Sequence, residues 1–257
     1  MRVLRLRLRG ESGTKVLVEL SSESGETREV DLERRSVDLR PVRTKRLRDD
    51  FHTIGYLRIT QFSESVPKKV EEALQELKEK EVEGLILDLR NNSGGLVSSG
   101  IAVADSLLSE KPIVETKDRN GIKDAIISQK ETSFDGPMVT LVNKGTASAS
   151  EILAGSLQDN ERSILMGEQT YGKGLIQSLK SLGEDSGIAI TVASYLTPKG
   201  KNIQGQGITP DKFLDFPDAS EYGTADDKWV RNAELFLEAI LENEKLSFQT
   251  SELSMKE

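Results

Sequence analysis

The sequence predicts an α/β protein with a largely parallel central sheet. Two observations support this prediction: nearly continuous apolar runs such as GLILDLR (84–90) and PMVTLVN (137–143), and intervening segments whose apolar residues recur every three or four positions. Strands that alternate with helices in this way form parallel sheets covered by helices. At 257 residues the chain is long enough to bury a sizeable core.

The amino-terminal segment differs from the rest. KVLVEL (15–20) and REVDLERRSVDL (28–39) alternate apolar and polar residues on either side of a polar turn, which predicts a β-hairpin. Two strands do not form a stable domain alone. We therefore expect this segment either to join the main sheet or to belong to a small incomplete domain, and we place the boundary between 1–47 and 48–257.

The main domain then alternates strands with helices. A strand begins at Ile54, and Pro67 marks the first turn of an amphipathic helix whose Val70, Leu74 and Leu77 form one apolar stripe. The turn NNSGG (91–95) follows the strand 84–90. Further elements are predicted as a helix from Val97, a polar loop around 118–121, a strand at 137–143, a helix at 148–157, strands at 163–167, 174–179 and 187–196, loop and short strand over 197–214, a closing helix around 229–240 and a frayed polar tail of about fifteen residues.

Composition excludes several kinds of function. The chain has no cysteine and one histidine, His52, which excludes thiolate nucleophiles, cysteine zinc sites and multi-histidine metal sites. A net charge of −8 argues against general nucleic-acid binding, and no apolar stretch is long enough to span a membrane. His52 precedes the first strand of the main domain without a flanking motif, which is typical of a surface or strand-edge histidine.

The segment 141–177 contains the strongest candidate chemistry. Ser148 and Glu151 fit a capping box, so Ser148 could do no more than cap a helix. The same position would also place its hydroxyl beside the free N–H groups of a helix start, such as that of Ala149, which can stabilise an oxyanion. Thr146 and Ser150 are further hydroxyl candidates, although the helix start favours Ser148.

A serine nucleophile needs a base, and His52 lacks a flanking motif for that role, so Lys173 is the remaining candidate base. It lies in Tyr-Gly-Lys-Gly between two segments that are predicted as buried strands, and Ser-Lys pairs are an accepted combination of nucleophile and base. Burial without a nearby carboxylate would favour the uncharged amine, which could then accept the serine proton. Gln177, four residues further on, could hold the amine in place without charging it.

The same lysine has a rival interpretation. GEQTYGKG (167–174) fits a phosphate-binding loop except that Gly174 replaces the usual Ser or Thr, and LILDL (85–89) resembles the strand whose aspartate holds magnesium. The hydroxyl is missing, the segment after Lys173 is strand-like, and the aspartate strand precedes the loop. An NTPase is therefore the weaker interpretation.

The turn NNSGG also has two interpretations. Glycine reaches positive φ angles easily, which suits a turn from strand to helix. A backbone N–H of Gly94 or Gly95 could instead point into the same cleft as Ala149 N–H and complete an oxyanion hole.

Four blocks in this order, DLRNNSGGL, VNKGTASASEILAGSLQDN, GEQTYGKGLIQ and YLTPKGKNIQGQGITPD, closely resemble the carboxyl-terminal processing proteases, also called tail-specific proteases. The resemblance implies a ClpP/crotonase-like α/β core and a serine endopeptidase that cuts near the carboxyl end of protein substrates through an acyl-enzyme, without a metal or other cofactor. At the matching positions, the resemblance implies that Ser148 is the nucleophile, Lys173 the general base and Gln177 the residue that orients the lysine. It also implies that Gly94 and Ala149 supply the oxyanion N–H groups and that Asp159 has a supporting role.

The family also carries a PDZ domain upstream of this core, and the hairpin resembles only the last part of one. Residues 1–47 are therefore interpreted as an incomplete PDZ-like segment. The family usually has proline where Ser93 stands, but both glycines of the turn are kept. Family members act outside the cytoplasm, in the bacterial periplasm or the thylakoid lumen, on proteins with exposed carboxyl-terminal tails. A non-hydrolysing peptide-binding scaffold of the same fold is the alternative, against which the intact Ser148, Lys173 and Gln177 argue.

Overall fold

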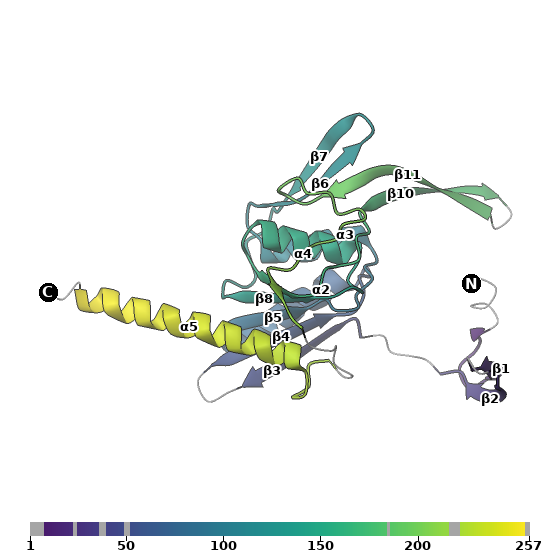
Figure 1. Ribbon diagram of the computed structural model, residues 1–257, viewed down its shortest axis with the longest axis horizontal. Coiled ribbons are helices and arrows are strands. Elements are labelled where there is room, and N and C mark those ends of the chain that lie inside the picture. The colour runs from purple at the N-terminus through teal and green to yellow at the C-terminus, as the bar shows by residue number, and fades with distance from the viewer. Residues whose placement is uncertain are drawn as a thin grey trace. The chain divides into compact units, whose positions relative to one another are not determined.

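The computed structural model describes residues 8–22, 25–35, 40–48, 52–183, 186–215 and 222–254. They belong to two compact units, Met1–Arg40 and Pro41–Glu257 (Figure 1). In the first unit β1 (Lys15–Ser21) pairs antiparallel with β2 (Thr27–Glu33), which confirms the predicted hairpin. Its kinship to a PDZ domain stays a prediction.

The second unit is built on a six-stranded sheet. The strand order is β12, β9, β8, β5, β4, β3, and all neighbours are parallel except the antiparallel pair of β3 and β4. Every residue of β5 and β8 is buried, as expected for inner strands with continuous apolar runs. The bounds are β3 (Val42–Arg48), β4 (Thr53–Ile59), β5 (Gly84–Asp88), β8 (Met138–Val142), β9 (Ile164–Gly167) and β12 (Lys212–Phe213).

Strand β3 was not predicted, and it moves the boundary between the units. It pairs with β4 along its whole length, from Val42 opposite Ile59 to Arg48 opposite Thr53. The division therefore lies after Arg40 and not after residue 47. Its sequence, VRTKRLR, is dominated by basic residues, as suits an edge strand, and lacks the apolar run that identified the inner strands.

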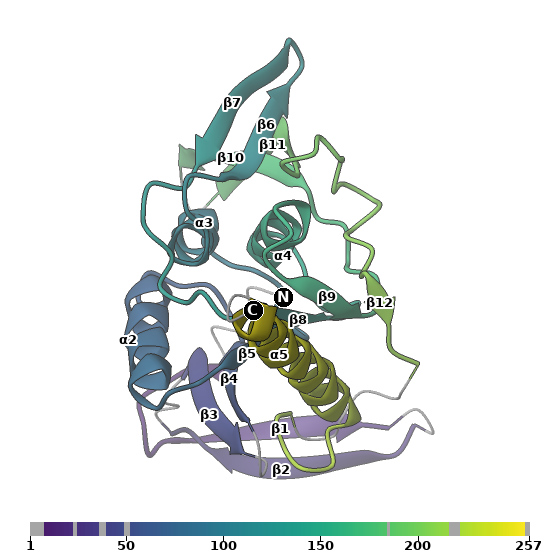
Figure 2. The same cartoon turned by 90° about the vertical axis from the view of Figure 1, so that its left-hand side faces the viewer.

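Helices cover both faces of this sheet (Figure 2). Because successive strand residues point to opposite faces, Leu57 and Leu87 pack with three helices on one side, and Tyr56 and Ile86 pack with α5 on the other. The helices are α2 (Val66–Glu79), α3 (Val97–Leu107) and α4 (Ala149–Asp159) on the first face and α5 (Lys228–Ser254) on the second.

A second, four-stranded sheet was predicted only in part. Its order is β10, β11, β6, β7, with every pair antiparallel. The predicted polar loop around 118–121 is the turn of a hairpin that sequence patterns missed. The bounds are β6 (Pro112–Asp118), β7 (Gly121–Ile127), β10 (Leu175–Gly183) and β11 (Ser186–Leu196).

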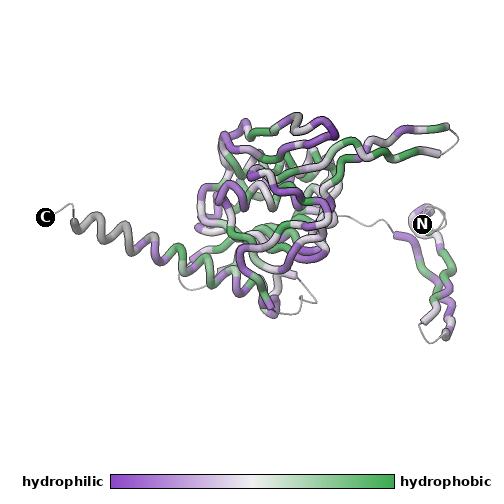
Figure 3. Tube along the Cα trace, turned by 45° about the horizontal axis from the view of Figure 1, so that its top comes forward, coloured by the Kyte–Doolittle hydropathy of each residue, from purple (hydrophilic) through white to green (hydrophobic). Residues whose placement is uncertain are grey.

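The expectation that the strand after Lys173 (174–179) is buried is wrong. This strand lies in β10, which pairs with β11. The two strands form a hairpin that projects from the body of the unit and carries apolar residues into solvent (Figures 1 and 3). Leu182, Ile188 and Val192 are 68%, 45% and 49% exposed. The expectation of a frayed tail is also wrong in part, because α5 continues to Ser254. Within the described ranges, no helix has both the length and the apolar composition that a membrane span requires.

A buried cluster of charges connects the main sheet to the segment before α5. Asp88, Arg90 and Asp227 are each 0% exposed. Arg90 donates to both carboxylates: Nη2 lies 2.7 Å from Asp88 Oδ2 and 2.6 Å from Asp227 Oδ2. Tyr56 OH adds a hydrogen bond of 2.6 Å to Asp88. The buried charges are therefore paired and hydrogen-bonded, as their burial requires.

This pairing predicts how stability depends on pH. Burial alone would raise the pKa of Asp227, but hydrogen bonds from Arg90 and from Gly223 N–H hold that pKa below its ordinary value of 3.8. A carboxylate of this kind stabilises the fold above its unfolded-state pKa and loses that contribution as pH falls through its folded-state pKa. We expect the wild-type free energy of unfolding to drop below about pH 4.

Urea unfolding between pH 7 and pH 2.5 measures this effect. Asp227→Asn should be less stable than wild type at pH 7 and should lose less stability on acidification, whereas Asp124→Asn on an exposed strand position should follow the wild-type curve. Equal pH dependence in Asp227→Asn and wild type would contradict the assignment.

Candidate active site

Ser148 occupies a strained position between β8 and α4. It is the N-cap of α4 with φ 58° and ψ −119°, a combination that costs a non-glycine residue about 1–3 kcal/mol and recurs at functional sites. The predicted capping box is present, since Glu151 Oε2 accepts the Ser148 N–H at 2.8 Å. The Ser148 side chain is half-buried at the surface of the unit.

The structure distinguishes Ser148 from the two neighbouring hydroxyls. Thr146 and Ser150 are both 0% exposed. Thr146 Oγ1 donates to Leu89 O at 2.9 Å and Ser150 Oγ donates to Asn92 O at 2.9 Å. Both hydroxyls therefore connect α4 and its preceding turn to the neighbouring loop, which leaves Ser148 as the accessible hydroxyl of this cluster.

Glu151 joins the serine segment to the lysine segment. Its carboxylate is 0% exposed and accepts four hydrogen bonds. Oε2 receives the backbone N–H groups of Ser148 and Lys173, each at 2.8 Å. Oε1 receives Thr170 Oγ1 and Gly172 N–H, each at 2.6 Å. Hydrogen bonds to a charged group are stronger than bonds between neutral groups. One buried carboxylate therefore fixes the distance between the backbone at Ser148 and the backbone at Lys173.

Lys173 departs from its predicted environment in two ways. Its side chain is exposed and not buried, because the segment after it enters the projecting hairpin β10–β11 and not an inner strand. A carboxylate is also close to it, since Glu151 binds its backbone N–H. The lysine segment is held from its other side by Gln204, whose Oε1 accepts Gly174 N–H at 3.0 Å.

Gly94 keeps a space open next to Ser148 and Ala149. A Cβ added to Gly94 would lie 2.8 Å from Ser148 Cβ and 3.1 Å from Ala149 N. Ala149 is the first residue of α4, so its N–H has no acceptor inside the helix. The N–H of Gly94 itself already donates to Asn92 Oδ1 at 3.0 Å. Gly94 therefore contributes to this space by lacking a side chain, and its N–H could act on an oxyanion only by leaving or sharing that bond.

One cavity of about 540 Å³ brings most of these segments together. Gln177 lies on its wall at an irregularity in the pairing of β10 with β11, and such bulges redirect side chains. The cavity is lined by Ser93, Gly145, Ala147, Tyr171, Gly172, Lys173, Leu175, Gln177 and Gln204.

Comparison with known proteins places this geometry in a family. The family model of peptidase family S41 matches residues 53–212, which include both sides of the cavity. The chain belongs to peptidase family S41. It is 47% identical over 215 residues to a carboxyl-terminal-processing protease of Synechocystis sp., an alignment that covers 82% of this chain and 50% of that protein.

Other members of peptidase family S41 are also similar. The carboxy-terminal processing protease CtpA of Bacillus subtilis is 36% identical over 212 residues, covering 82% of this chain and 45% of that protein. Among solved structures, the photosystem II D1 C-terminal processing protease superposes with a TM-score of 0.67 at 38% identity, covering 80% of this chain and 57% of that one. The predicted ClpP/crotonase-like α/β core is thereby confirmed, and the chain spans about half the length of the curated relatives it matches.

Two other candidate residues lie away from the cavity of this S41 peptidase. Asp159 is 7% exposed and accepts Lys199 N–H at 2.8 Å, so it fastens the loop that leads to Gln204. His52 is buried, and its Nδ1 lies 3.2 Å from Glu83 Oε2. Neither side chain lines the cavity.

The phosphate-loop interpretation of Lys173 does not fit the fold. The segment after Lys173 begins β10, so no helix start is present there to bind a phosphate. Asp88 is engaged with Arg58, Arg90 and Tyr56 in the buried cluster. Within the described ranges, no three histidine or carboxylate side chains gather as a metal site.

Sequence reasoning missed the role of Glu151 beyond the capping box. The capping box was the available signal, but a capping Glu needs only one of its oxygens for the N-cap N–H. The bonds to Thr170, Gly172 and Lys173 join residues about twenty positions apart. The contributions of Asn92 and Gln204 to the walls of the site likewise depend on the tertiary fold and had no sequence signal.

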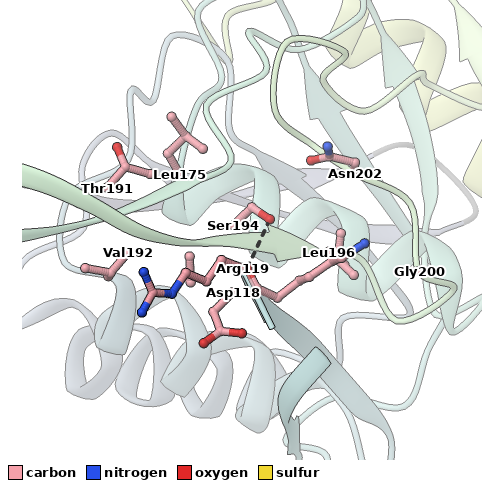
Figure 4. Close-up of a pocket in the computed structure, with 11 residues that line it drawn as sticks. Asp118, Arg119, Leu175, Thr191, Val192, Ser194, Leu196, Gly200 and Asn202 are labelled. Atoms are coloured by element: carbon pink, nitrogen blue, oxygen red, sulfur yellow. Dashed lines mark hydrogen bonds between the residues drawn. The ribbon is translucent and has the colours of Figure 1, made fainter. Parts of the chain in front are cut away.

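A second cavity adjoins the first at Leu175, whose side chain lines both. This cavity, of about 550 Å³, lies between β11, the end of β6 and the loop 200–202 (Figure 4). Ser194 Oγ donates to Lys117 O at 3.3 Å, between the neighbouring strands β11 and β6. None of the site residues predicted from sequence lines this second cavity.

Gly94→Ala tests the space beside Ser148. The added Cβ would collide with Ala147 O at 2.7 Å and Ser148 Cβ at 2.8 Å, so we expect kcat on a peptide substrate to fall by about 10²-fold or more, as for loss of an oxyanion interaction.

Gly183→Ala is the matched control, because Gly183 has φ +88°, close to the +94° of Gly94, but nothing within 4 Å of its Cβ position. It should lose stability to backbone strain and keep its kcat. Equal kcat losses in both variants would show that strain alone explains the result.

Glu151→Gln tests the shared carboxylate. The amide keeps one acceptor oxygen but replaces the other with an N–H₂ group, which faces donors such as Ser148 N–H or Lys173 N–H and cannot accept from them. Each buried donor left unpaired lowers the free energy of unfolding by about 1–3 kcal/mol. We expect a lower Tm and a kcat reduced at least tenfold. Glu161→Gln, on a side chain 87% exposed, should change neither quantity, and a wild-type kcat in Glu151→Gln would exclude the positioning role.

Proposed function

We propose that this chain is the catalytic part of a serine endopeptidase that hydrolyses peptide bonds near the carboxyl end of protein substrates. The observation that carries the proposal is the Glu151 carboxylate, because one oxygen binds the backbone N–H groups of both Ser148 and Lys173. This arrangement joins the segment that carries a hydroxyl at a helix start to the segment whose lysine lines the cavity. The chain offers no cysteine, and its one histidine is engaged elsewhere.

The proposed reaction has two stages. Ser148 Oγ attacks the scissile carbonyl carbon while Lys173 Nζ accepts the hydroxyl proton, and Ala149 N–H stabilises the oxyanion. The tetrahedral intermediate collapses when Lys173 returns the proton to the leaving amine, which leaves an acyl-enzyme on Ser148. Water then attacks the acyl-enzyme with Lys173 again as base. Gln177, on the same wall, would orient the amine.

Because Lys173 is exposed, we propose that bound substrate covers its amine. A base must give up its proton before it can accept another, and an exposed ammonium is well solvated. A polypeptide in the cavity that Lys173 and Leu175 line would cover the amine with apolar atoms and exclude water from it. Substrate binding would therefore complete the site that Glu151 assembles.

The substrates and the compartment are proposed from the relatives. The Synechocystis and Bacillus subtilis proteins are named as carboxyl-terminal processing proteases, and a relative of Tetradesmus obliquus is named as chloroplastic. We infer protein substrates with exposed carboxyl-terminal tails and a location outside the cytoplasm, in a bacterial periplasm or a thylakoid lumen.

The exposure of Lys173 also favours one alternative, a peptide-binding form that does not hydrolyse. Digestion of an unfolded reporter protein separates the two functions. The proposal expects carboxyl-terminal fragments with wild type and none with Ser148→Ala, at equal binding of the reporter. Binding without cleavage by wild type, in a preparation whose fold is verified, would support the scaffold.

The lysine predicts the pH dependence of catalysis. Because the amine must be uncharged to act as base, kcat/KM should rise from acid toward alkaline pH. Lys173→Arg keeps the charge but cannot lose its proton, so we expect it to lose about 10²–10⁴-fold in kcat, as Lys173→Ala should.

The matched control is Lys68→Arg on the exposed face of α2, where the lysine side chain is 83% exposed. It should keep both the rate and the pH profile. An activity maximum at acid pH, or wild-type activity in Lys173→Arg, would contradict the assignment of Lys173 as the base.

A further inference from the structure

The turn between β5 and α3 forms one wall of the space beside Ser148. Gly94 faces Ser148 and Ala149 across it. The turn is bonded to the segment that carries the serine, because Asn92 O accepts Ala147 N–H at 3.0 Å and Ser150 Oγ at 2.9 Å. A displacement of this turn would therefore change the shape of the proposed oxyanion site.

The first residues of the turn are held by contacts from a distant part of the chain. Arg90, which is 0% exposed, places Nη1 3.0 Å from Asp227 Oδ1 and Nη2 2.6 Å from Asp227 Oδ2. Asn91 donates from Nδ2 to Tyr222 OH. The Tyr222 ring lies against both nearby guanidinium groups, with its centroid 3.8 Å from Arg58 Cζ and 4.5 Å from Arg90 Cζ.

All of these contacts come from the short segment before α5, which lies more than seventy residues after Ser148. We call Tyr222, Gly223 and Asp227 the C-terminal clamp. The clamp is itself fixed, since Gly223 N–H donates to Asp227 Oδ2 at 2.9 Å and Lys45 Nζ of β3 donates to Gly223 O at 2.8 Å. A Cβ on Gly223 would lie 2.7 Å from the Tyr56 ring, so only glycine allows the segment to approach β4 this closely.

We propose that the C-terminal clamp is a positioning element of the active site. Tyr222 and Asp227 do not touch the substrate. They hold Asn91 and Arg90, and through them they fix Asn92 and Gly94 against the start of α4. The proposal rests on the proposed peptidase function, and it extends the site to a segment that sequence analysis did not include.

A positioning role and a purely stabilising role have different kinetic consequences. A clamp that only stabilises the fold would change the folded fraction but not the kcat of the folded enzyme. A clamp that positions the oxyanion wall lowers kcat per active site and leaves KM nearly unchanged, because a small misplacement of reacting groups slows the chemical step. The second pattern is the one that we expect.

Tyr222→Phe is the decisive variant, because it removes one hydroxyl and keeps the ring against the two arginines. We expect kcat to fall by about tenfold with KM within twofold. Asp227→Asn should lose more, since it removes the charge that faces Arg90. Tyr195→Phe removes a tyrosine hydroxyl from a buried strand position away from the clamp and should keep the wild-type kcat.

The measurement is steady-state hydrolysis of a peptide by the whole chain, with active sites counted by titration with a fluorophosphonate. If wild type neither hydrolyses the peptide nor reacts with the probe, the peptidase function itself fails. If wild type does both and Tyr222→Phe keeps its kcat per titrated site, the clamp proposal is overturned and the peptidase function stands. Should Asp227→Asn not fold, Tyr222→Phe still decides the question.

Discussion

The structure depends on a buried carboxylate that joins two distant parts of the chain. Glu151 receives four donors, two of them the backbone N–H groups of Ser148 and Lys173. The carboxylate lies in the first turn of α4, where the helix dipole favours a negative charge. Because the bonds from Ser148 and Lys173 come from their backbone N–H groups, they fix where the serine and lysine segments run without engaging either side chain.

The sheet supplies the second constraint. Parallel strands β5 and β8 end at the same edge, so the turns that follow them meet there. One turn carries Gly94 and the other carries Ser148, and Asn92 bonds them together. An ion pair between Arg90 and Asp227 holds the start of the first turn. The candidate site thus depends on a carboxylate that joins the serine segment to the lysine segment, and on an ion pair that holds the turn whose glycine lies beside Ser148.

Sequence patterns predicted the parts of the fold that are organised by burial. The strands β5 and β8 and the helices α2, α3 and α4 have the continuous or three-to-four-residue apolar periodicity that burial produces. The patterns failed where burial is slight. Strand β3 is a basic edge strand, and β6 and β7 were missed as a hairpin around a polar turn. Lys173 was expected to be buried because it lies between two apolar segments, yet the second of them, β10, forms an exposed hairpin with β11. Of the residues proposed from motifs, Lys173 and Gln177 line one cavity, and the Ser148 backbone is joined to the lysine segment through Glu151. Glu151 and Tyr222 act through contacts that only the fold creates.

The central claim is that Ser148 is the nucleophile of this chain. Reaction of the folded protein with a fluorophosphonate, followed by peptide mass mapping of the adduct, tests it most directly. The account predicts one adduct on Ser148, formed more slowly as the pH falls and absent after unfolding. An adduct on Ser150 or Thr146 would contradict the claim. It would also be contradicted by a protein that hydrolyses a peptide although its Ser148 carries no adduct after all of the probe has been consumed.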